Sequence, residues 1–377
     1  MLYTTGWIHL GDGPRVLHVP SSARHGGRYF VLALYDAWTN NFANPGLRTS
    51  DPAGETVVLT GPGTARDVRL PTGARVIPCP TDLVWLIARV VVGTGDDIEP
   101  ARALQSDIRL DCPPDTDTGR LPPGVADWVG APQDTMAALQ ERPADAQAIA
   151  GAFFTNLCRA LAGTEVPQPD QGMLSWFARG KLVPGTAFDW AWLDAPLRDG
   201  LTRGLSDAAA LLEANSRSRA ARPWVASFSL GKYGTQYITR ALTAYKGLGG
   251  LVSDEAVYAM SDFDADRQPL DGQNSYLMHF EAGNLPPVDA FGSVTLDDAD
   301  RFLYPNALAR HAIGDRTPGL QTNPDGSLTL RIGHTPPDDT ANWLPAPSGR
   351  FYLILRLYCP RPETRSWPIP PLHRIAG

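Results

Sequence analysis

The chain has 377 residues, a formal net charge of -7 and 43% hydrophobic residues, which is typical of a globular protein and excludes a disordered chain or a coiled coil. Its negative charge and the absence of a long lysine and arginine cluster argue against a nucleic-acid partner. No apolar run of about 18 or more residues occurs, and the chain opens without a signal-peptide pattern, so we expect a soluble protein without a membrane span.

The first 110 residues contain short strand-like runs separated by glycine- and proline-rich turns, with no helical period between them. Such runs predict a β barrel or sandwich. They read RVLHVP, RYFVLALYD, TVVLTG, RVIPCP and LVWLIARVVVG. The 36 glycines and 35 prolines of the chain also suit a loop-rich β framework.

The middle of the chain changes to a helical period. Apolar residues that recur at spacings of three and four predict a helix from about Pro143, followed by helices over Pro196 to Ser216 and Tyr237 to Leu248. In the first of them these residues are Ala146, Ile149, Ala150, Phe153, Phe154, Leu157 and Leu161.

Strands return after Asn274, in the runs NSYLMHFEAG, VDAFGSVTLDD, RFLYPN, SLTLRIGH and RFYLILRLYCP. This order differs from the alternating pattern of a doubly wound nucleotide-binding fold. The predicted fold is mainly β with a helical insertion (α+β). We place an N-terminal β domain at residues 1–125, the helical insertion at 126–255 and a second β domain at 256–377.

Sequence motifs for cofactors and metals are incomplete. No dinucleotide fingerprint, P-loop, GxSxG elbow or HExxH motif occurs. The four cysteines show no CxxC spacing, and a single disulfide between two of them is an alternative that the sequence leaves open. The run DFDADRQPLDG begins like a calcium loop, but Arg267 and Gln273 occupy the positions that need glycine and glutamate. We therefore expect no cofactor and no metal.

Several strings, in chain order, resemble one known family. They are LYTTGWIHL, YDAWTNNFANPGLRT, TDLVWLIARV, GKLVPGTAFDW, GKYGTQYITRALTAYKGLGG, LPPVDAFGSVTL, AIGDRTPGL and NWLPAPSGRFYLILRLYCPRPE. Together they resemble the proteins that pair a DUF1254 region with a C-terminal DUF1214 region, both of unknown function. The resemblance covers nearly the whole chain and implies two β domains, the second jelly-roll-like, with a helical insertion between them.

Two departures from the family bear on the site and on localisation. The family commonly has Asn, Trp and Tyr where this chain has Asp289, Gly292 and Asp297, so two aromatic residues that would line a pocket are replaced. Relatives also carry more chain before the first string, often with an export signal. The sequence therefore predicts no particular compartment, and an N-terminally shortened member is one interpretation.

Two charged residues interrupt apolar strand rows near the N-terminus. Because side chains alternate along a strand, Asp36 falls on the face of Phe30, Leu32 and Leu34. By the same count, Arg89 shares a face with four apolar residues, namely Leu83, Trp85, Ile87 and Val91. An unpaired buried charge is costly, so we predict that Asp36 and Arg89 approach one another, either as a catalytic pair or as a structural ion pair.

Polar and aromatic residues beside this pair have two interpretations. Trp38, Asn40 and Asn41 follow Asp36 directly, and Trp85 lies on the strand of Arg89. They are candidate ligand-binding residues in a pocket near the N-terminal β domain. Alternatively, the amides cap the turn backbone and the indoles fill a core.

A second candidate site follows the run SLTLRIGH. His334 ends an inward-facing row and could act as a general base, with Asn342 and Trp343 as ligand-binding residues on the same rim. The alternative is a hydrogen-bonded histidine at a strand end, because no activated nucleophile is identifiable beside it.

The residues support two hypotheses of function. The first is a cofactor-independent enzyme, a hydrolase or lyase, that uses Asp36, Arg89 and His334 as catalytic residues. The second is a non-catalytic ligand-binding or assembly module for an apolar or sugar-like molecule. A homo-oligomer is also possible, because subunits often cover exposed strand edges.

Overall fold

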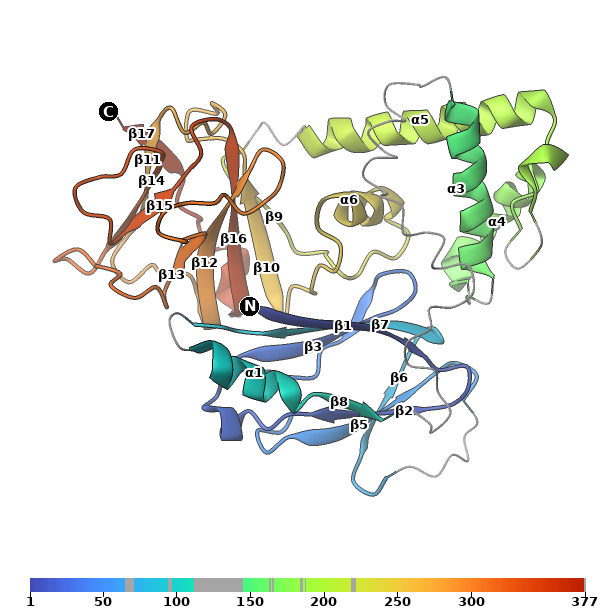
Figure 1. Ribbon diagram of the computed structural model, residues 1–377, viewed down its shortest axis with the longest axis horizontal. Helices are drawn as coiled ribbons and strands as arrows, with labels where there is room; N and C mark the ends of the chain where they lie inside the picture. The colour runs from blue at the N-terminus through green and yellow to red at the C-terminus, as the bar shows by residue number, and fades with distance from the viewer. Residues whose placement is uncertain are drawn as a thin grey trace.

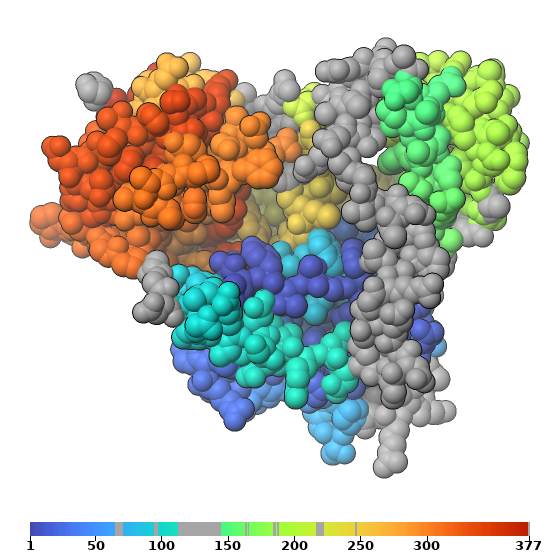
Figure 2. All heavy atoms as spheres, viewed as in Figure 1, coloured from blue at the N-terminus to red at the C-terminus, as the bar shows by residue number. Residues whose placement is uncertain are grey.

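A computed structural model describes residues 1–64, 71–93, 97–111, 145–162, 164, 166–183, 186, 188–217 and 222–375. The chain forms a β domain at each end with a helical segment in the middle, which confirms the predicted fold class (Figure 1). The predicted boundary at residue 125 lies outside the described residues. In the space-filling view, atoms of the yellow α6 region are visible between the blue N-terminal and the orange C-terminal domain (Figure 2).

The N-terminal domain consists of two four-stranded sheets that pack face to face. In sheet order, the first contains β1 (Leu2–His9), β7 (Leu83–Val90), β3 (Phe30–Tyr35) and β4 (Asn41–Ala43). The second contains β6 (Arg75–Pro78), β5 (Glu55–Thr60), β2 (Arg15–Val19) and β8 (Arg109–Asp111). Between them lies an apolar core that includes Phe30, Leu32 and Leu34, as the alternation along β3 predicted.

Helix α1 (Ile98–Ser106) packs on this core, so the expectation of an all-strand segment before residue 110 is wrong. Only Ala101 and Leu104 are buried on it. The helix has nine residues, fewer than the window of about 11–18 residues over which a helical period is read.

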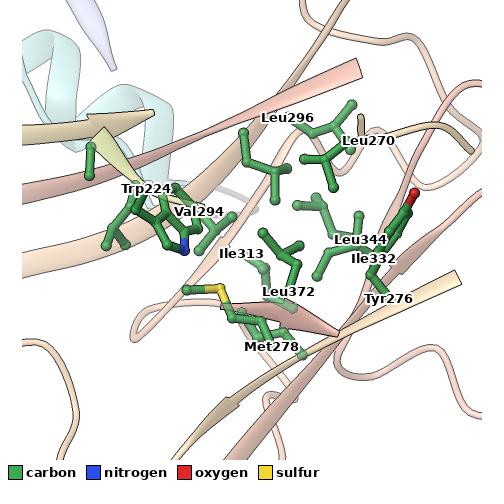
Figure 3. Packing of buried hydrophobic residues seen from close by; sticks show 14 of the residues in the cluster. Trp224, Leu270, Tyr276, Met278, Val294, Leu296, Ile313, Ile332, Leu344 and Leu372 are labelled. Carbon is green, nitrogen blue, oxygen red and sulfur yellow. The ribbon is translucent and has the colours of Figure 1, made fainter. Parts of the chain in front are cut away.

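The C-terminal domain also contains two sheets. In sheet order, the first is formed by β13 (Ala312–Gly314), β12 (Val288–Asp298), β16 (Phe351–Pro360), β10 (Ala256–Ser261) and β9 (Val225–Ser227). The second is formed by β15 (Trp343–Pro345), β14 (Leu328–Gly333), β11 (Ser275–Phe280) and β17 (Leu372–Ile375). Figure 3 shows the core between them, where Ile313 of the first sheet lies close to Leu372 of the second.

The helical segment contains α3 (Ala146–Leu161), α4 (Gln171–Phe177), α5 (Ala195–Arg217) and α6 (Tyr237–Gly247). Short 3-10 helices occupy Ala23–His25, Gln168–Asp170, Ala178–Gly180, Trp190–Trp192 and Pro362–Arg365. Helices α3 and α4 project away from both β domains, whereas α6 lies at the side where the two β domains meet (Figure 1). Strand β9 falls inside the predicted helical insertion, yet it pairs with β10 in the C-terminal sheet. Among the described residues, no helix is long and apolar enough to cross a membrane.

The two β domains share a second apolar cluster at their interface. The face of β3 that points away from the N-terminal core carries Tyr29, Val31, Ala33 and Tyr35, and these residues pack with Tyr358 and other residues of the C-terminal domain. Strand β3 is therefore covered on both faces, which explains why all six of its residues are buried.

Candidate functional site

A cavity of about 620 Å³ lies between the two β domains and α6. The N-terminal domain contributes Tyr3 of β1 and Arg89 of β7 to its wall, and α6 contributes Leu242 and Thr243. This volume lies within the range of small-molecule sites, about 300–1,000 Å³.

The C-terminal wall of the cavity follows from the alternation of β16. Leu353, Leu355 and Leu357 are buried in the core of the C-terminal domain. The alternate residues, Tyr352, Ile354, Arg356 and Tyr358, line the cavity. A strand with one apolar face and one face of aromatic and charged residues thus separates the core from the site.

Arg89 is the charged residue that β7 places at the cavity. Its side chain is buried, its Nη2 donates to the Gly249 carbonyl over 2.7 Å, and its guanidinium lies 5.8 Å from the centre of the Tyr3 ring. Burial lowers the pKa of Arg89, but the oxygens of Tyr35 and other tyrosines outweigh this effect, so the net direction is upward. Arg89 is therefore a permanently charged group in the wall.

The loop after α6 holds this guanidinium in place. The Gly249 carbonyl also accepts a hydrogen bond of 2.7 Å from the Tyr35 hydroxyl. Gly249 has a φ of +82°, and a Cβ atom there would lie 2.7 Å from Cδ1 of Ile87. Only glycine fits this position without strain, because the backbone is left-handed and the neighbouring strand is close.

Tyrosine hydroxyls are the other polar groups of the site. Burial raises the pKa of Tyr258 to about 12, and the guanidiniums of Arg89 and Arg356 partly offset this effect. Burial likewise raises the pKa of Tyr358 well above its ordinary value. Both phenols therefore stay neutral near pH 7 and can donate hydrogen bonds.

Asp297 is the single carboxyl group among the described lining residues. Asp297 of β12 is directly opposite Tyr352 in the sheet and is buried. Burial raises the pKa of Asp297, while Arg356 and a hydrogen bond with Tyr352 lower it in part.

The structure separates Asp36 from Arg89, so the predicted pair is wrong. Arg89 is directly opposite Val31 in the sheet, and residues that face each other on antiparallel strands point to the same side. Arg89 therefore lies on the interface side of the sheet. Asp36 follows the strand five positions further on, a distance of about 16 Å at about 3.3 Å per residue.

Asp36 instead organises the turn between β3 and β4. Its Oδ1 accepts from the backbone N–H groups of Trp38 and Asn40, and its Oδ2 accepts from Asn40 Nδ2. Burial raises the pKa of Asp36, and these hydrogen bonds lower it in part. Thr39 in the same turn has a φ of +63°.

The side-chain amides of Asn40 and Asn41 bind this turn to the chain segments before and after α6. Asn40 Oδ1 accepts from the Tyr233 backbone N–H, and Asn41 Oδ1 accepts from the Val252 backbone N–H. Trp38 lies near Arg240 of α6, with 6.0 Å from the guanidinium carbon to the ring centre. These contacts join the turn to distant segments of the chain.

Trp85 lies on the face of Arg89, as predicted, but does not belong to the described lining of the cavity. Its ring stacks on Trp7 at 5.4 Å, and its indole N–H donates to Thr5 Oγ1 over 2.8 Å.

The second predicted site lies in the other sheet of the C-terminal domain. His334 is exposed, and its Nδ1 is 3.0 Å from the Ala346 carbonyl. Asn342 donates to the carbonyls of Gln321 and Thr329, and the buried indole of Trp343 donates to the Gly333 carbonyl. All of these partners are backbone carbonyls, and the cavity lining lacks these three residues.

The run that resembled a calcium loop forms a turn around a buried aspartate. Asp264 accepts from the backbone N–H groups of Asp266 and Gln268 and forms an ion pair with Arg374. The described residues contain no cluster of three or more side chains that could hold a metal ion.

Sequence reasoning missed Tyr3, Tyr258, Arg356 and Tyr358 as site residues. The alternation of leucines with polar and aromatic residues in RFYLILRLYCP is the one local signal that could have found Arg356 and Tyr358. Strand pairing places Tyr3 and Tyr258 at the site. Tyr3 is directly opposite Arg89 in the N-terminal sheet, and Tyr258 is directly opposite Arg356 in the C-terminal sheet.

One comparison with a solved structure agrees with this architecture. None of the curated proteins matches the chain. Over its full length, the chain is similar in structure to the VPA0106 protein from Vibrio parahaemolyticus, with a TM-score of 0.66, 22% identity and 89% of that chain covered. This likeness shows the fold alone. For an uncharacterized protein from Burkholderia cenocepacia the TM-score is 0.47, with 12% identity over 99% of this chain and 76% of that one.

Two family descriptions match the β domains. Residues 1–112 match "Protein of unknown function (DUF1254)", and residues 255–362 match "Protein of unknown function (DUF1214)". The first match ends close to the limit of the N-terminal sheets, whereas β9 and β17 of the C-terminal sheets lie outside the second match. The chain therefore belongs to the family of proteins in which a DUF1254 region is followed by a DUF1214 region.

Proposed function

We propose that this protein binds a small molecule with an apolar or aromatic body in the cavity between its two β domains. The observation that carries the proposal is the composition of the cavity wall. Leucine, isoleucine, valine and methionine side chains alternate there with tyrosines and a few charged groups. Concave, largely apolar sites with a small number of convergent polar groups are typical of ligand-binding proteins.

Of the three residues predicted to be catalytic, Arg89 alone lines this cavity. Asp36 is engaged in its turn, and His334 lies at a strand end of another sheet. This separation supports the ligand-binding hypothesis over a hydrolase or lyase that would need the three together. We assign Arg89 a ligand-binding role.

A neutral fluorescent dye, N-phenyl-1-naphthylamine, tests the proposal. Its emission rises when it leaves water, so titration of the protein gives a dissociation constant. The Thr243→Trp variant places an indole into the cavity from α6 and is expected to weaken dye binding by about tenfold or more, because the bulky ring occupies the space of the ligand.

The matched control is Ala244→Trp, which adds the same indole at the next, exposed position of α6. Dye binding by this variant should equal that of the wild type. Equal dye binding by all three proteins would place the dye elsewhere and overturn the proposal.

A further inference from the structure

The cavity wall carries more positive than negative charge, although the whole chain has a net charge of -7. Its described lining includes the guanidiniums of Arg89, Arg301 and Arg356 and the carboxyl group of Asp297. Burial favours the neutral form of Asp297. An excess of fixed positive charge in a hollow between two low-dielectric walls attracts anions.

The charge of Arg89 lacks an ionic partner within the described part of the chain. No carboxylate oxygen of a described residue lies within 4.0 Å of its guanidinium; its hydrogen-bond acceptors are the Gly249 carbonyl and, at 3.5 Å, the Tyr35 hydroxyl. Glu255 is close enough to feel its charge, but the oxygens of Glu255 bind Tyr29 and Arg48. Buried charges are ordinarily paired, so this arrangement leaves room for an anionic partner.

Arg356, in the C-terminal domain, is a second guanidinium of the wall that can bind an anion. Its side chain is half-buried in the wall, and it makes no hydrogen bond or ion pair to any described residue, Asp297 included. Arg89 and Arg356 both act on the phenols of Tyr258 and Tyr358, whose pKa values each of them lowers. Both guanidiniums line the same cavity, one from each β domain, together with Tyr358 and with Tyr258, which is directly opposite Arg356 in the sheet.

From this geometry we infer that the ligand of the cavity is an organic anion, whose acidic head group binds between Arg89 and Arg356 while its apolar body lies against α6. The inference rests on the proposed function and names the chemical class of its ligand. Guanidinium forks match planar or tetrahedral oxyanions, and the neutral tyrosine hydroxyls add further donors. Because the two arginines belong to different domains, such a ligand would bridge the domain interface.

Two dyes that differ by one acidic group test the inference. The dye 8-anilino-1-naphthalenesulfonate is N-phenyl-1-naphthylamine with an added sulfonate. The wild type should bind the sulfonate dye about tenfold more tightly than the neutral one, since charge-assisted hydrogen bonds are each equivalent to about tenfold or more in affinity. The Thr243→Trp variant should weaken binding of both dyes.

Arg356→Gln is the decisive variant because Arg356 makes no hydrogen bond or ion pair to any described residue, so the substitution breaks no such contact. It should weaken binding of the sulfonate dye about tenfold and change that of the neutral dye by less than about twofold. Arg331→Gln is the matched control, since Arg331 is also a half-buried arginine on a strand of this domain but does not line the cavity. It should change neither affinity.

The outcomes separate the two proposals. Equal affinities for the two dyes in the wild type, or an equal loss of both in Arg356→Gln, would overturn the anion inference and leave the binding proposal standing. Unchanged binding of the neutral dye in Thr243→Trp would overturn the binding proposal itself.

Discussion

Asp297 is a buried carboxyl group whose ionisation opposes folding. Its pKa is raised by burial in the folded protein, so between its ordinary pKa and the raised value the folded state holds more protons than the unfolded state. Stability from this group is therefore complete below the ordinary pKa and is lost as the pH rises through the folded pKa. The same group would set the charge of the cavity near the two guanidiniums.

We expect the pH dependence of the free energy of unfolding to reveal this group. The difference between the wild type and Asp297→Asn should decline as the pH rises above about 4, because the unfolded wild type releases a proton there that the folded protein still holds. Urea denaturation at a series of pH values measures it, with Asp12→Asn at an exposed position as control. A difference that grows with pH would contradict the raised pKa of Asp297.

At the scale of elements, the loop after α6 connects the helical segment to the strand that carries Arg89. The carbonyl of Gly249 accepts from both Arg89 and Tyr35, which lie on adjacent strands β7 and β3. A change in this loop should therefore affect both the stability of the protein and the position of the guanidinium.

Gly249→Ala should lower the free energy of unfolding by about 1–3 kcal/mol, because a Cβ atom is strained at positive φ and would collide with Ile87. It should also weaken binding of the sulfonate dye. Chemical denaturation and dye titration measure the two effects. Gly204→Ala is the control in the interior of α5, where a Cβ atom meets nothing within 4 Å and should stabilise the helix by about 0.5–1 kcal/mol. Equal stabilities of the two variants would contradict the argument.

The strands illustrate how far local sequence determines structure. The two-residue period correctly assigned Phe30, Leu32 and Leu34 to one face of β3, and Ile87 and Arg89 to one face of β7. This period does not determine which face of β7 lies on the same side of the sheet as a given face of β3. A shift of one residue in the register between the strands exchanges the two faces. The error over Asp36 and Arg89 has this origin.

At the scale of the whole molecule, one buried carboxylate joins the two β domains. Glu255 begins the matched C-terminal region, and its oxygens accept from the Tyr29 hydroxyl over 2.8 Å and from Arg48 Nε over 2.7 Å, both in the N-terminal domain. Together with the interface cluster around Tyr358, this network holds the cavity walls in place.

Glu255→Gln should lower the free energy of unfolding by about 1–3 kcal/mol, because Arg48 loses its charged partner and a buried hydrogen bond is weakened. Glu99→Gln, which changes an exposed carboxylate of α1, should have an effect of less than about 0.5 kcal/mol. Urea denaturation compares the two variants. An equal, small effect of both would show that the interface network contributes little to stability.

The sequence by itself determined the alternation of strands, the helical middle segment and the family, because strand and helix periods follow from local backbone geometry and family strings are local. Only the tertiary structure decided that Arg89 faces the C-terminal domain and that Arg356 and Tyr258 join it around one cavity. Arg89 is more than 150 positions away in the sequence from both of these residues. Their arrangement around the cavity depends on strand register and on domain packing, which no local pattern encodes.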